Sequence, residues 1–350
     1  MNKNLFKNTL KNLPSENRDH TYLLTKNNVL FCVAGNYHSF KYINGMPYYF
    51  LKGELESILN TKINSYITVG DKKFSKLLNY IDLSEYPSFI KKNYKSYYYS
   101  PCGWRSLMKV NRSEIKKVFD PQKFVKHLLK KSELKKHKGN PIIYLLKQMH
   151  SYNPLLLSNV GITGSALITK NINHFGKDID LVFYGNYVAL LVEEFSFTVC
   201  KEDPRINSLM GNHLKEYVKN KINKFPGTEK EFIRLVKDRW DTIFVDGFKV
   251  DFTFCKDNTE TEFLNNMNIL RPVSIRTKIT DVSESYFLPT VLGIENPRFE
   301  KVIITARGYI CLFKQNDKVE IRGTIHYSKK TQKELIVVDE LAGGRVVILD

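Results

Sequence analysis

The sequence Gly161-Ile-Thr-Gly-Ser-Ala-Leu-Ile-Thr-Lys-Asn-Ile-Asn-His-Phe-Gly-Lys-Asp-Ile-Asp-Leu-Val-Phe-Tyr184 predicts a short strand, a tight turn that opens a helix, a loop and a second strand. Gly164 at the turn lets a ligand approach the backbone, and Ser165 adds a hydroxyl donor. The N–H groups at the start of a helix are unpaired and carry partial positive charge. Gly164 and Ser165 are therefore predicted to bind phosphate.

Two carboxylates follow on the second strand of this stretch. Residues two apart on a strand face the same side, so Asp178 and Asp180 are expected to lie side by side while Ile179 and Leu181 face the core. Adjacent carboxylates repel each other unless a cation joins them, and a divalent metal is the usual cation. Alone, the Asp-Ile-Asp triplet is more typical of an edge strand whose acids discourage aggregation.

A third carboxylate lies further along the chain. Residues 242–254 predict a hairpin with Asp246-Gly247 at its turn. In the second arm, Asp251 alternates with apolar residues and therefore points away from the apolar face. Lys249 shares that side of the strand and is either a counter-charge for the site or a surface lysine. Three carboxylates on two strands beside a phosphate-binding turn suit two-metal phosphoryl transfer.

This constellation resembles the DNA polymerase β-like nucleotidyltransferase superfamily. The superfamily motif is Gly-(Gly/Ser), about a dozen residues, Asp-apolar-(Asp/Glu)-apolar and a later apolar-Asp-apolar strand. Here the matching segments are Gly164-Ser165, Asp178-Ile-Asp180-Leu181 and Val250-Asp251-Phe252. More loosely, the whole chain is similar to an uncharacterised archaeal family assigned to the nucleotidyltransferases, through patches such as 30–38 and 104–121.

The resemblance implies a mechanism and a set of roles. Two Mg²⁺ (or Mn²⁺) ions would be held by Asp178 and Asp180, with Asp251 completing one site and lying closest to the acceptor hydroxyl. Gly164 and Ser165 would hold the phosphates of an NTP such as ATP, with Lys249 as a further candidate for nucleotide binding. The fold implied is α+β, with a mixed sheet and helices forming the nucleotidyltransferase core.

Three domains are expected. Residues 1–120 are predicted to form a strand-rich N-terminal domain, and 121–270 the catalytic domain. Residues 271–350 predict short strands, including 302–305, 309–313 and 335–338, and hence a small C-terminal β-barrel. An OB-like barrel is the candidate form, with RNA binding as its candidate role. Such barrels commonly bind single-stranded nucleic acid, although fold analogy alone does not establish function.

Helix starts are predicted where a capping residue precedes proline or a capping box occurs. Asp120-Pro121, Asn140-Pro141 and Asp203-Pro204 carry the first signal, and Thr228-Glu-Lys-Glu231 the second. The last helix is expected to present cations on its outer face, where they would meet triphosphate or RNA; these are Arg234, Lys237 and Arg239.

The charge balance favours a polyanionic partner. The chain has 54 Lys and Arg against 36 Asp and Glu, a formal net charge of +18. Such an excess predicts affinity for nucleic acid. The alternative is that the lysines reflect an AT-rich genome. The aromatic stretch 94–105 is either a stacking platform for unpaired bases or a strand whose Tyr rings alternate between core and surface.

The remaining composition suggests a cytoplasmic protein. No apolar run approaches the length of a membrane span, and the N-terminus lacks the apolar core of a signal peptide, so no membrane partner is expected. The cysteines show neither a disulfide framework nor a CxxC zinc pattern. They are expected to be reduced and buried; they are Cys32, Cys102, Cys200, Cys255 and Cys311.

The sequence therefore predicts a metal-dependent enzyme that transfers a nucleoside monophosphate from an NTP to an acceptor hydroxyl, with RNA favoured as acceptor. One alternative is nucleotidylation of a protein or a small molecule, as in toxin-type or antibiotic-modifying relatives. A second alternative is a non-catalytic RNA-binding protein on the same fold, which the presence of all three carboxylates disfavours.

Overall fold

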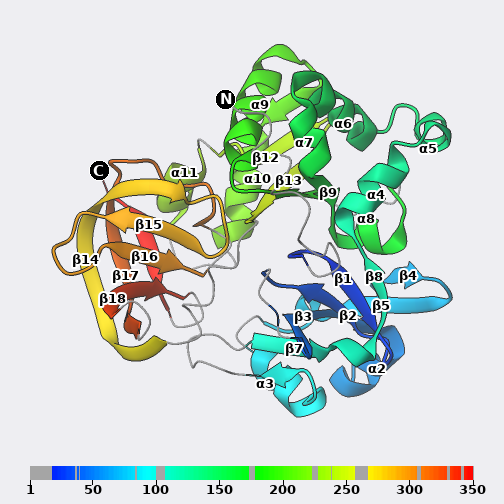
Figure 1. Cartoon of the computed structure of the whole chain (residues 1–350), viewed down its shortest axis with the longest axis horizontal. Coiled ribbons are helices and arrows are strands. Elements are labelled where there is room, and N and C mark those ends of the chain that lie inside the picture. Colours follow the sequence, from blue (N-terminus) through cyan, green and yellow to red (C-terminus); the bar gives the residue numbers. More distant parts are fainter. Residues whose placement is uncertain are drawn as a thin grey trace.

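The chain is mixed α+β, with three sheets and ten helices in the described part of the computed structural model. Figure 1 shows the second sheet and its helices above the other two, with the first sheet at the lower right and the third at the left. The described residues are 18–35, 38, 40–82, 85–99, 107–172, 178–222, 228–237, 239–256, 267–305, 309–328, 332–339 and 343–349. The prediction of an α+β chain is confirmed.

The first sheet has eight strands, and its main path runs β4-β5-β3-β2-β1-β8. The strand-rich character expected for this part of the chain is confirmed, although two helices were missed. Its elements are β1 Tyr22–Thr25, β2 Leu30–Val33, β3 Tyr42–Leu51, α2 Lys52–Leu59, β4 Ile67–Val69, β5 Lys72–Lys76, α3 Tyr86–Asn93, β6 Tyr98–Tyr99, β7 Leu107–Asn111 and β8 Ile115–Phe119.

Two tyrosines of the aromatic stretch are core residues. The rings of Tyr94 and Tyr97 are buried, with centroids 4.5 Å from that of Phe50 and 5.9 Å from that of Phe31, respectively. Buried rings cannot stack on a base, so for these two residues the packing interpretation holds. Residues 100–106, which include Trp104 and Arg105 of the same prediction, lie outside the described residues.

The second sheet has five strands in the order β11-β12-β13-β10-β9. Two of the predicted caps are confirmed: the side chains of Asp120 and Asn140 accept hydrogen bonds from the backbone N–H groups of Lys123 and Ile142, both at 2.9 Å. The elements are α4 Pro121–Leu128, α5 Lys131–Lys136, α6 Pro141–Tyr152, α7 Pro154–Asn159, β9 Val160–Ile162, α8 Gly164–Thr169, β10 Asp178–Tyr184, α9 Val188–Glu202, β11 Ile206–Ser208, α10 Gly211–Ile222, α11 Glu229–Val236, β12 Thr242–Val245 and β13 Phe248–Cys255.

The helix predicted directly after Asp203-Pro204 is wrong. The Asp203 carboxylate accepts a hydrogen bond from the Arg205 N–H at 3.0 Å within a turn, and the chain then enters β11, which pairs with β12. Ile206 is buried on this edge of the sheet. Sheet pairing and burial therefore outweigh the local capping signal, and the helix α10 begins only at Gly211.

The third sheet has six strands and curls, since β14 pairs with both β15 and β17. The strand expected at 309–313 is wrong: these residues lie outside the strands, with Cys311 at a φ of 60°. Ile310 packs with the core of the first two sheets and Leu312 with that of the third, so burial explains the apolar run. The strands are β14 Met267–Glu284, β15 Thr290–Ile294, β16 Lys301–Ile304, β17 Lys318–Ser328, β18 Lys333–Val338 and β19 Arg345–Ile348.

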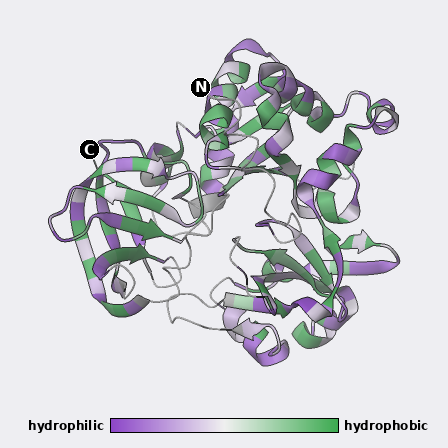
Figure 2. Cartoon of the chain, in the orientation of Figure 1, coloured by the Kyte–Doolittle hydropathy of each residue, from purple (hydrophilic) through white to green (hydrophobic). Residues whose placement is uncertain are grey.

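One hydrophobic core joins the first two sheets. Tyr22 and Tyr49 from the first sheet pack in the same cluster as Ile179, Leu181 and Phe252 from the second. Hydrophobic residues follow the strands of both sheets in Figure 2, whereas α5 is largely hydrophilic. Among the described residues, no helix combines the length and the apolar character needed to span a bilayer.

Candidate active site

The three predicted carboxylates meet on neighbouring strands. β10 and β13 are parallel, and Asp180 lies opposite Asp251 while Asp178 lies opposite Lys249. Oxygen atoms of Asp178, Asp180 and Asp251 all lie within 4.8 Å of one another. The alternation predicted along β10 is confirmed, because Ile179 and Leu181 are buried on the opposite face.

Asp251 is held in place by two neighbours. The Thr242 hydroxyl, on the adjacent strand β12, donates a hydrogen bond of 2.8 Å to Oδ1 of Asp251, and the Lys249 ammonium pairs with Oδ2. The predicted hairpin is confirmed, with positive φ at both turn residues, 49° at Asp246 and 80° at Gly247. The turn sets the register that brings Thr242 opposite Asp251.

Gly164 touches the carboxylate cluster. Its φ is +67°, and a Cβ atom built on it would lie 2.6 Å from Oδ2 of Asp180. The N–H of the preceding residue, Thr163, donates to the Asp180 carbonyl at 3.0 Å. Glycine is therefore required here both by backbone conformation and by the approach of the chain to the carboxylate. Ser165 follows in the first turn of α8, as predicted, and is partly buried.

The cluster concentrates negative charge on one exposed carboxylate, Asp178, and two partly buried ones, Asp180 and Asp251. Burial, followed by the charges of Asp178 and Asp251, raises the pKa of Asp180 to about 6, and Lys249 and His20 oppose this rise. A carboxylate in this state is stabilised by any cation that approaches it. The electrostatics therefore favour binding of a positively charged group.

Two tyrosines of the first sheet lie within electrostatic reach of the carboxylates, which the sequence did not reveal. Tyr49 of β3 is buried, which raises its pKa, and the charges of Tyr48 and Asp180 raise it further. Burial raises the pKa of Tyr22 of β1, and the charge of Asp180 raises it further after larger effects from Cys32, Tyr48 and Tyr49. No motif in the sequence predicted this proximity, because it depends on how two separate sheets pack.

The cations predicted on α11 and just beyond it are partly engaged within the protein. The Arg239 side chain is largely buried, with 10% of its surface exposed, and binds the Asp241 carboxylate through Nε at 2.5 Å and Nη2 at 2.7 Å. Nη2 of Arg234 donates to the Leu349 carbonyl at 2.5 Å. Burial with a bidentate partner explains why Arg239 is not presented to a ligand, whereas Lys237 is exposed.

In the sequence, the loop between α8 and β10 separates the Gly164-Ser165 turn from Asp178. Residues 173–177 of this loop, including His174, lie outside the described residues.

Comparison of the chain with protein-family models, with curated proteins and with solved structures gave no match.

Proposed function

We propose that the chain is a metal-dependent nucleotidyltransferase that moves a nucleoside monophosphate from an NTP to an acceptor hydroxyl, with release of pyrophosphate. One observation carries the proposal: Asp178, Asp180 and Asp251 meet within 4.8 Å on two adjacent parallel strands, beside the Gly164 turn. The arrangement is the one that the polymerase β-like superfamily motif implies, and the proposal includes that fold for the second sheet and its helices.

The donor set suits Mg²⁺ or Mn²⁺, of which two ions are proposed. Carboxylate oxygens are the ligands that these hard cations prefer, and the raised pKa of Asp180 supports a cation at this position. Asp178, Asp180 and Asp251 would hold the ions. When bound, they would neutralise charge on the nucleotide phosphates and favour ionisation of the acceptor hydroxyl.

The remaining residues position these carboxylates and the nucleotide. Thr242 fixes the orientation of Asp251, which is assigned to the acceptor side. Lys249 neutralises Asp251 in the free protein and is placed to exchange that carboxylate for a phosphate oxygen. Because the Gly164 backbone lies against the Asp180 carboxylate, a nucleotide beside the carboxylates also lies beside the N–H groups of Gly164 and Ser165.

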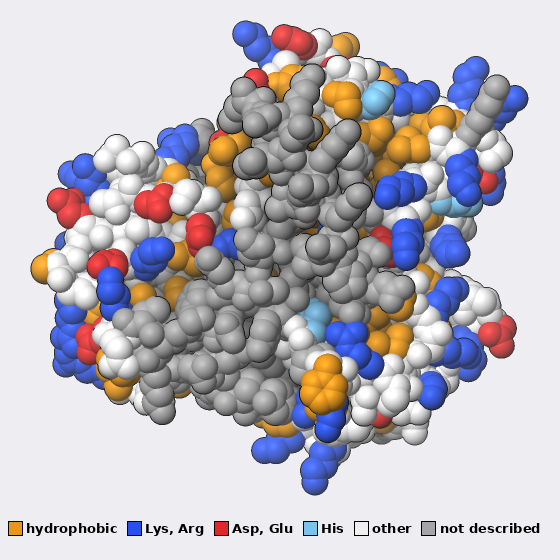
Figure 3. All heavy atoms as spheres, in the orientation of Figure 1, with side chains coloured by type: hydrophobic (Ala, Val, Ile, Leu, Met, Phe, Trp, Pro, Cys, Tyr) orange, Lys and Arg blue, Asp and Glu red, His pale blue; other side chains and the backbone are white. Residues whose placement is uncertain are grey.

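RNA is the acceptor that we propose. The net charge of +18 supports a polyanionic partner. Figure 3 shows Lys and Arg side chains over the first sheet and around α4 and α5, with few acidic ones among them. The strand pairings of the third sheet also run through β14, β15, β16, β18 and β17 back to β14, which supports a small OB-like barrel and an RNA-binding role for it.

The test is incorporation of each α-labelled NTP into total cellular RNA, with Mg²⁺ or Mn²⁺. Label should enter RNA with the wild type and be lost in Asp178→Ala/Asp180→Ala. Asp246→Asn is the matched control, since it lies on the β12–β13 turn away from the cluster and retains a residue that tolerates positive φ. Label in protein or a small molecule would favour the alternative acceptors, and no transfer with retained RNA binding would favour a non-catalytic protein.

A further inference from the structure

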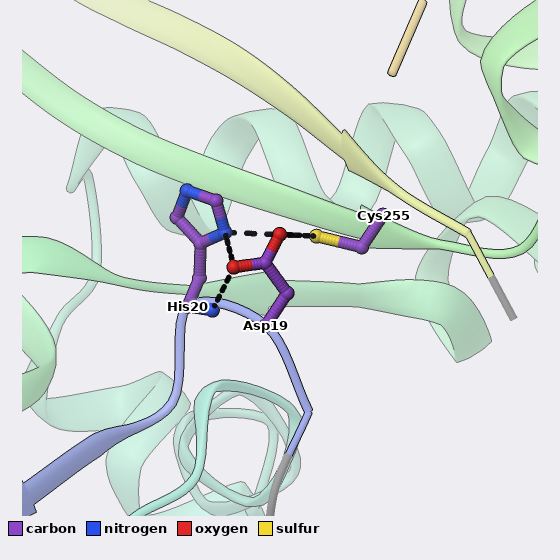
Figure 4. A group of neighbouring side chains, drawn as sticks. All are labelled: Asp19, His20 and Cys255. Carbon is purple, nitrogen blue, oxygen red and sulfur yellow. Dashed lines mark hydrogen bonds and ion pairs between the residues drawn. The ribbon is translucent and has the colours of Figure 1, made fainter. Parts of the chain in front are cut away.

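A second group of ligand-type side chains shares no residue with the carboxylate cluster and was not predicted from the sequence. Asp19 and His20 precede β1, from which Thr21 separates them, and Cys255 is the last residue of β13. All three residues are buried, with exposed fractions of 9%, 5% and 3%. Figure 4 shows the three side chains converging on one point from two distant segments of the chain.

Two of the three closest distances in this group match those between zinc ligands, and the third is slightly shorter. Cys255 Sγ lies 3.6 Å from Asp19 Oδ2 and 3.6 Å from His20 Nδ1, and His20 Nδ1 lies 3.1 Å from Asp19 Oδ1. When one ligand atom is taken from each residue, the three atoms all lie within 4.8 Å of one another. Ligands placed tetrahedrally at about 2.3 Å for sulfur and about 2.0–2.1 Å for nitrogen and oxygen lie roughly 3.3–3.6 Å apart.

The orientation of the imidazole separates metal binding from nucleophilic catalysis. In a Cys-His-Asp triad the two ring nitrogens face opposite partners, one the thiol and the other the carboxylate. Here the single atom Nδ1 faces both Cys255 and Asp19, and the other ring nitrogen points away from them (Figure 4). Three donors that share one centre are arranged as ligands around a metal ion.

We propose that Asp19, His20 and Cys255 bind a zinc ion. Thiolate, imidazole and carboxylate form a mixed set that zinc accepts, whereas the all-oxygen set of the aspartate cluster suits Mg²⁺. Binding displaces the thiol proton to solvent, so zinc is held by the Cys255 thiolate. The two sites thus select different metals by the chemistry of their donors.

The segment that carries two of the ligands is already fixed in place. The Thr163 hydroxyl donates to the His20 carbonyl at 2.9 Å, and the Tyr184 hydroxyl donates to the Asp19 carbonyl at 3.0 Å. Such preorganisation lowers the conformational entropy lost on binding. Zinc would tie this segment to Cys255 of β13, which lies four residues beyond Asp251. It would therefore stabilise the strand that carries the third carboxylate.

The first test uses Co²⁺ as a spectroscopic substitute in the full chain prepared without metal. Wild type should show a thiolate-to-cobalt charge-transfer band and the visible bands of tetrahedral cobalt. Cys255→Ala and His20→Ala should lose the charge-transfer band. Cys200→Ala, at a partly exposed cysteine elsewhere, is the matched control and should keep it. Asp178→Ala/Asp180→Ala should also keep it, because the aspartate cluster has no sulfur.

The second test is metal analysis combined with thermal unfolding. Zinc should be bound by the wild type and raise its melting temperature, since a ligand that binds only the folded state stabilises it. The shift should be absent in Cys255→Ala and present in Cys200→Ala. A wild type that binds no zinc and shows no charge-transfer band would overturn the proposal. Retention of the band in Cys255→Ala would also overturn it, and the group would then be a hydrogen-bonded cluster.

Discussion

The backbone of Gly164 lies so close to Asp180 that a Cβ atom at Gly164 would be 2.6 Å from the carboxylate oxygen Oδ2. The turn at the start of α8 and the second carboxylate of β10 are thereby one structural unit. A side chain at position 164 would displace the carboxylate or the turn, and either movement disturbs the proposed metal and phosphate contacts.

We expect Gly164→Ala to reduce nucleotidyl transfer at least tenfold, because alanine must displace Asp180. The positive φ adds strain of roughly 1–3 kcal/mol to the folded state. Transfer rate and melting temperature are measured together. Gly139→Ala is the matched control, because Gly139 has a φ of +85° but open space around its Cβ position. Equal losses of activity in the two variants would show that backbone strain, and not contact with Asp180, is responsible.

Thr242→Val should lower transfer while leaving the fold nearly intact. Valine has the shape of threonine but removes the 2.8 Å hydrogen bond to Asp251, a bond to a charged group that contributes about 1.5–3 kcal/mol. We expect about a tenfold loss in kcat, measured at saturating nucleotide. Thr277→Val, whose hydroxyl donates to the Glu295 carbonyl in the third sheet, should retain full activity. An unchanged kcat in Thr242→Val would rule out a positioning role for Thr242.

Asp180→Asn should stabilise the protein when no metal is present. The pKa of Asp180 rises from 3.8 to about 6 on folding, so the folded state holds this proton more tightly than the unfolded chain does. The contribution of this group to stability therefore falls as pH rises from about 4 to about 6, and the loss remains above that range. Asparagine removes the effect, which is roughly 1–3 kcal/mol.

The measurement is chemical unfolding at pH 4, 5, 6 and 7 with chelator. Wild type should lose stability relative to Asp180→Asn across this range, and Mg²⁺ or Mn²⁺ should then stabilise the wild type alone. Identical pH profiles for the two proteins would contradict the charge repulsion inferred for the cluster.

Lys249→Gln should affect metal and nucleotide binding in opposite directions. The Lys249 ammonium pairs with Asp251 and lies opposite Asp178 in the strand register. Its removal leaves the cluster more negative, so Mn²⁺ should bind several-fold more tightly. A nucleotide should bind more weakly, because its phosphates lose the positively charged partner that Lys249 would provide. Calorimetric titration measures both affinities.

Lys256→Gln is the control for this experiment, because Lys256 follows the same strand but pairs with Glu284 at 2.8 Å. Neither affinity should change in that variant. If Lys249→Gln also bound Mn²⁺ and nucleotide with unchanged affinity, Lys249 would be a surface lysine without a role in the site.

Local signals in the sequence were sufficient to predict several elements. The caps at Asp120 and Asn140 are confirmed because a cap depends on hydrogen bonds within one turn. The β12–β13 hairpin is confirmed for the same reason, since Asp246-Gly247 specifies its turn. The outward direction of Asp178 and Asp180 follows from the two-residue period of a strand.

Other predictions failed where distant contacts outweigh local preference. β11 forms after Asp203 because β12 offers an edge to pair with. The residues 310–313 are apolar because two cores enclose them, and not because they form a strand. Arg239 has the spacing of a surface cation, but its side chain is largely buried against Asp241. In each case the deciding partner is supplied by tertiary packing.

The sequence by itself determined which residues form the candidate site, since the Gly164-Ser165 turn, the Asp178–Asp180 pair and the Asp251 strand are each local patterns. Only the tertiary structure decided that β10 and β13 are parallel neighbours with Asp180 opposite Asp251. It also decided that His20, near the start of the described residues, meets Cys255, which lies 235 positions later in the sequence. The physical reason is that strand pairing and side-chain convergence arise from burial shared between distant segments, for which no short stretch of sequence contains the partner.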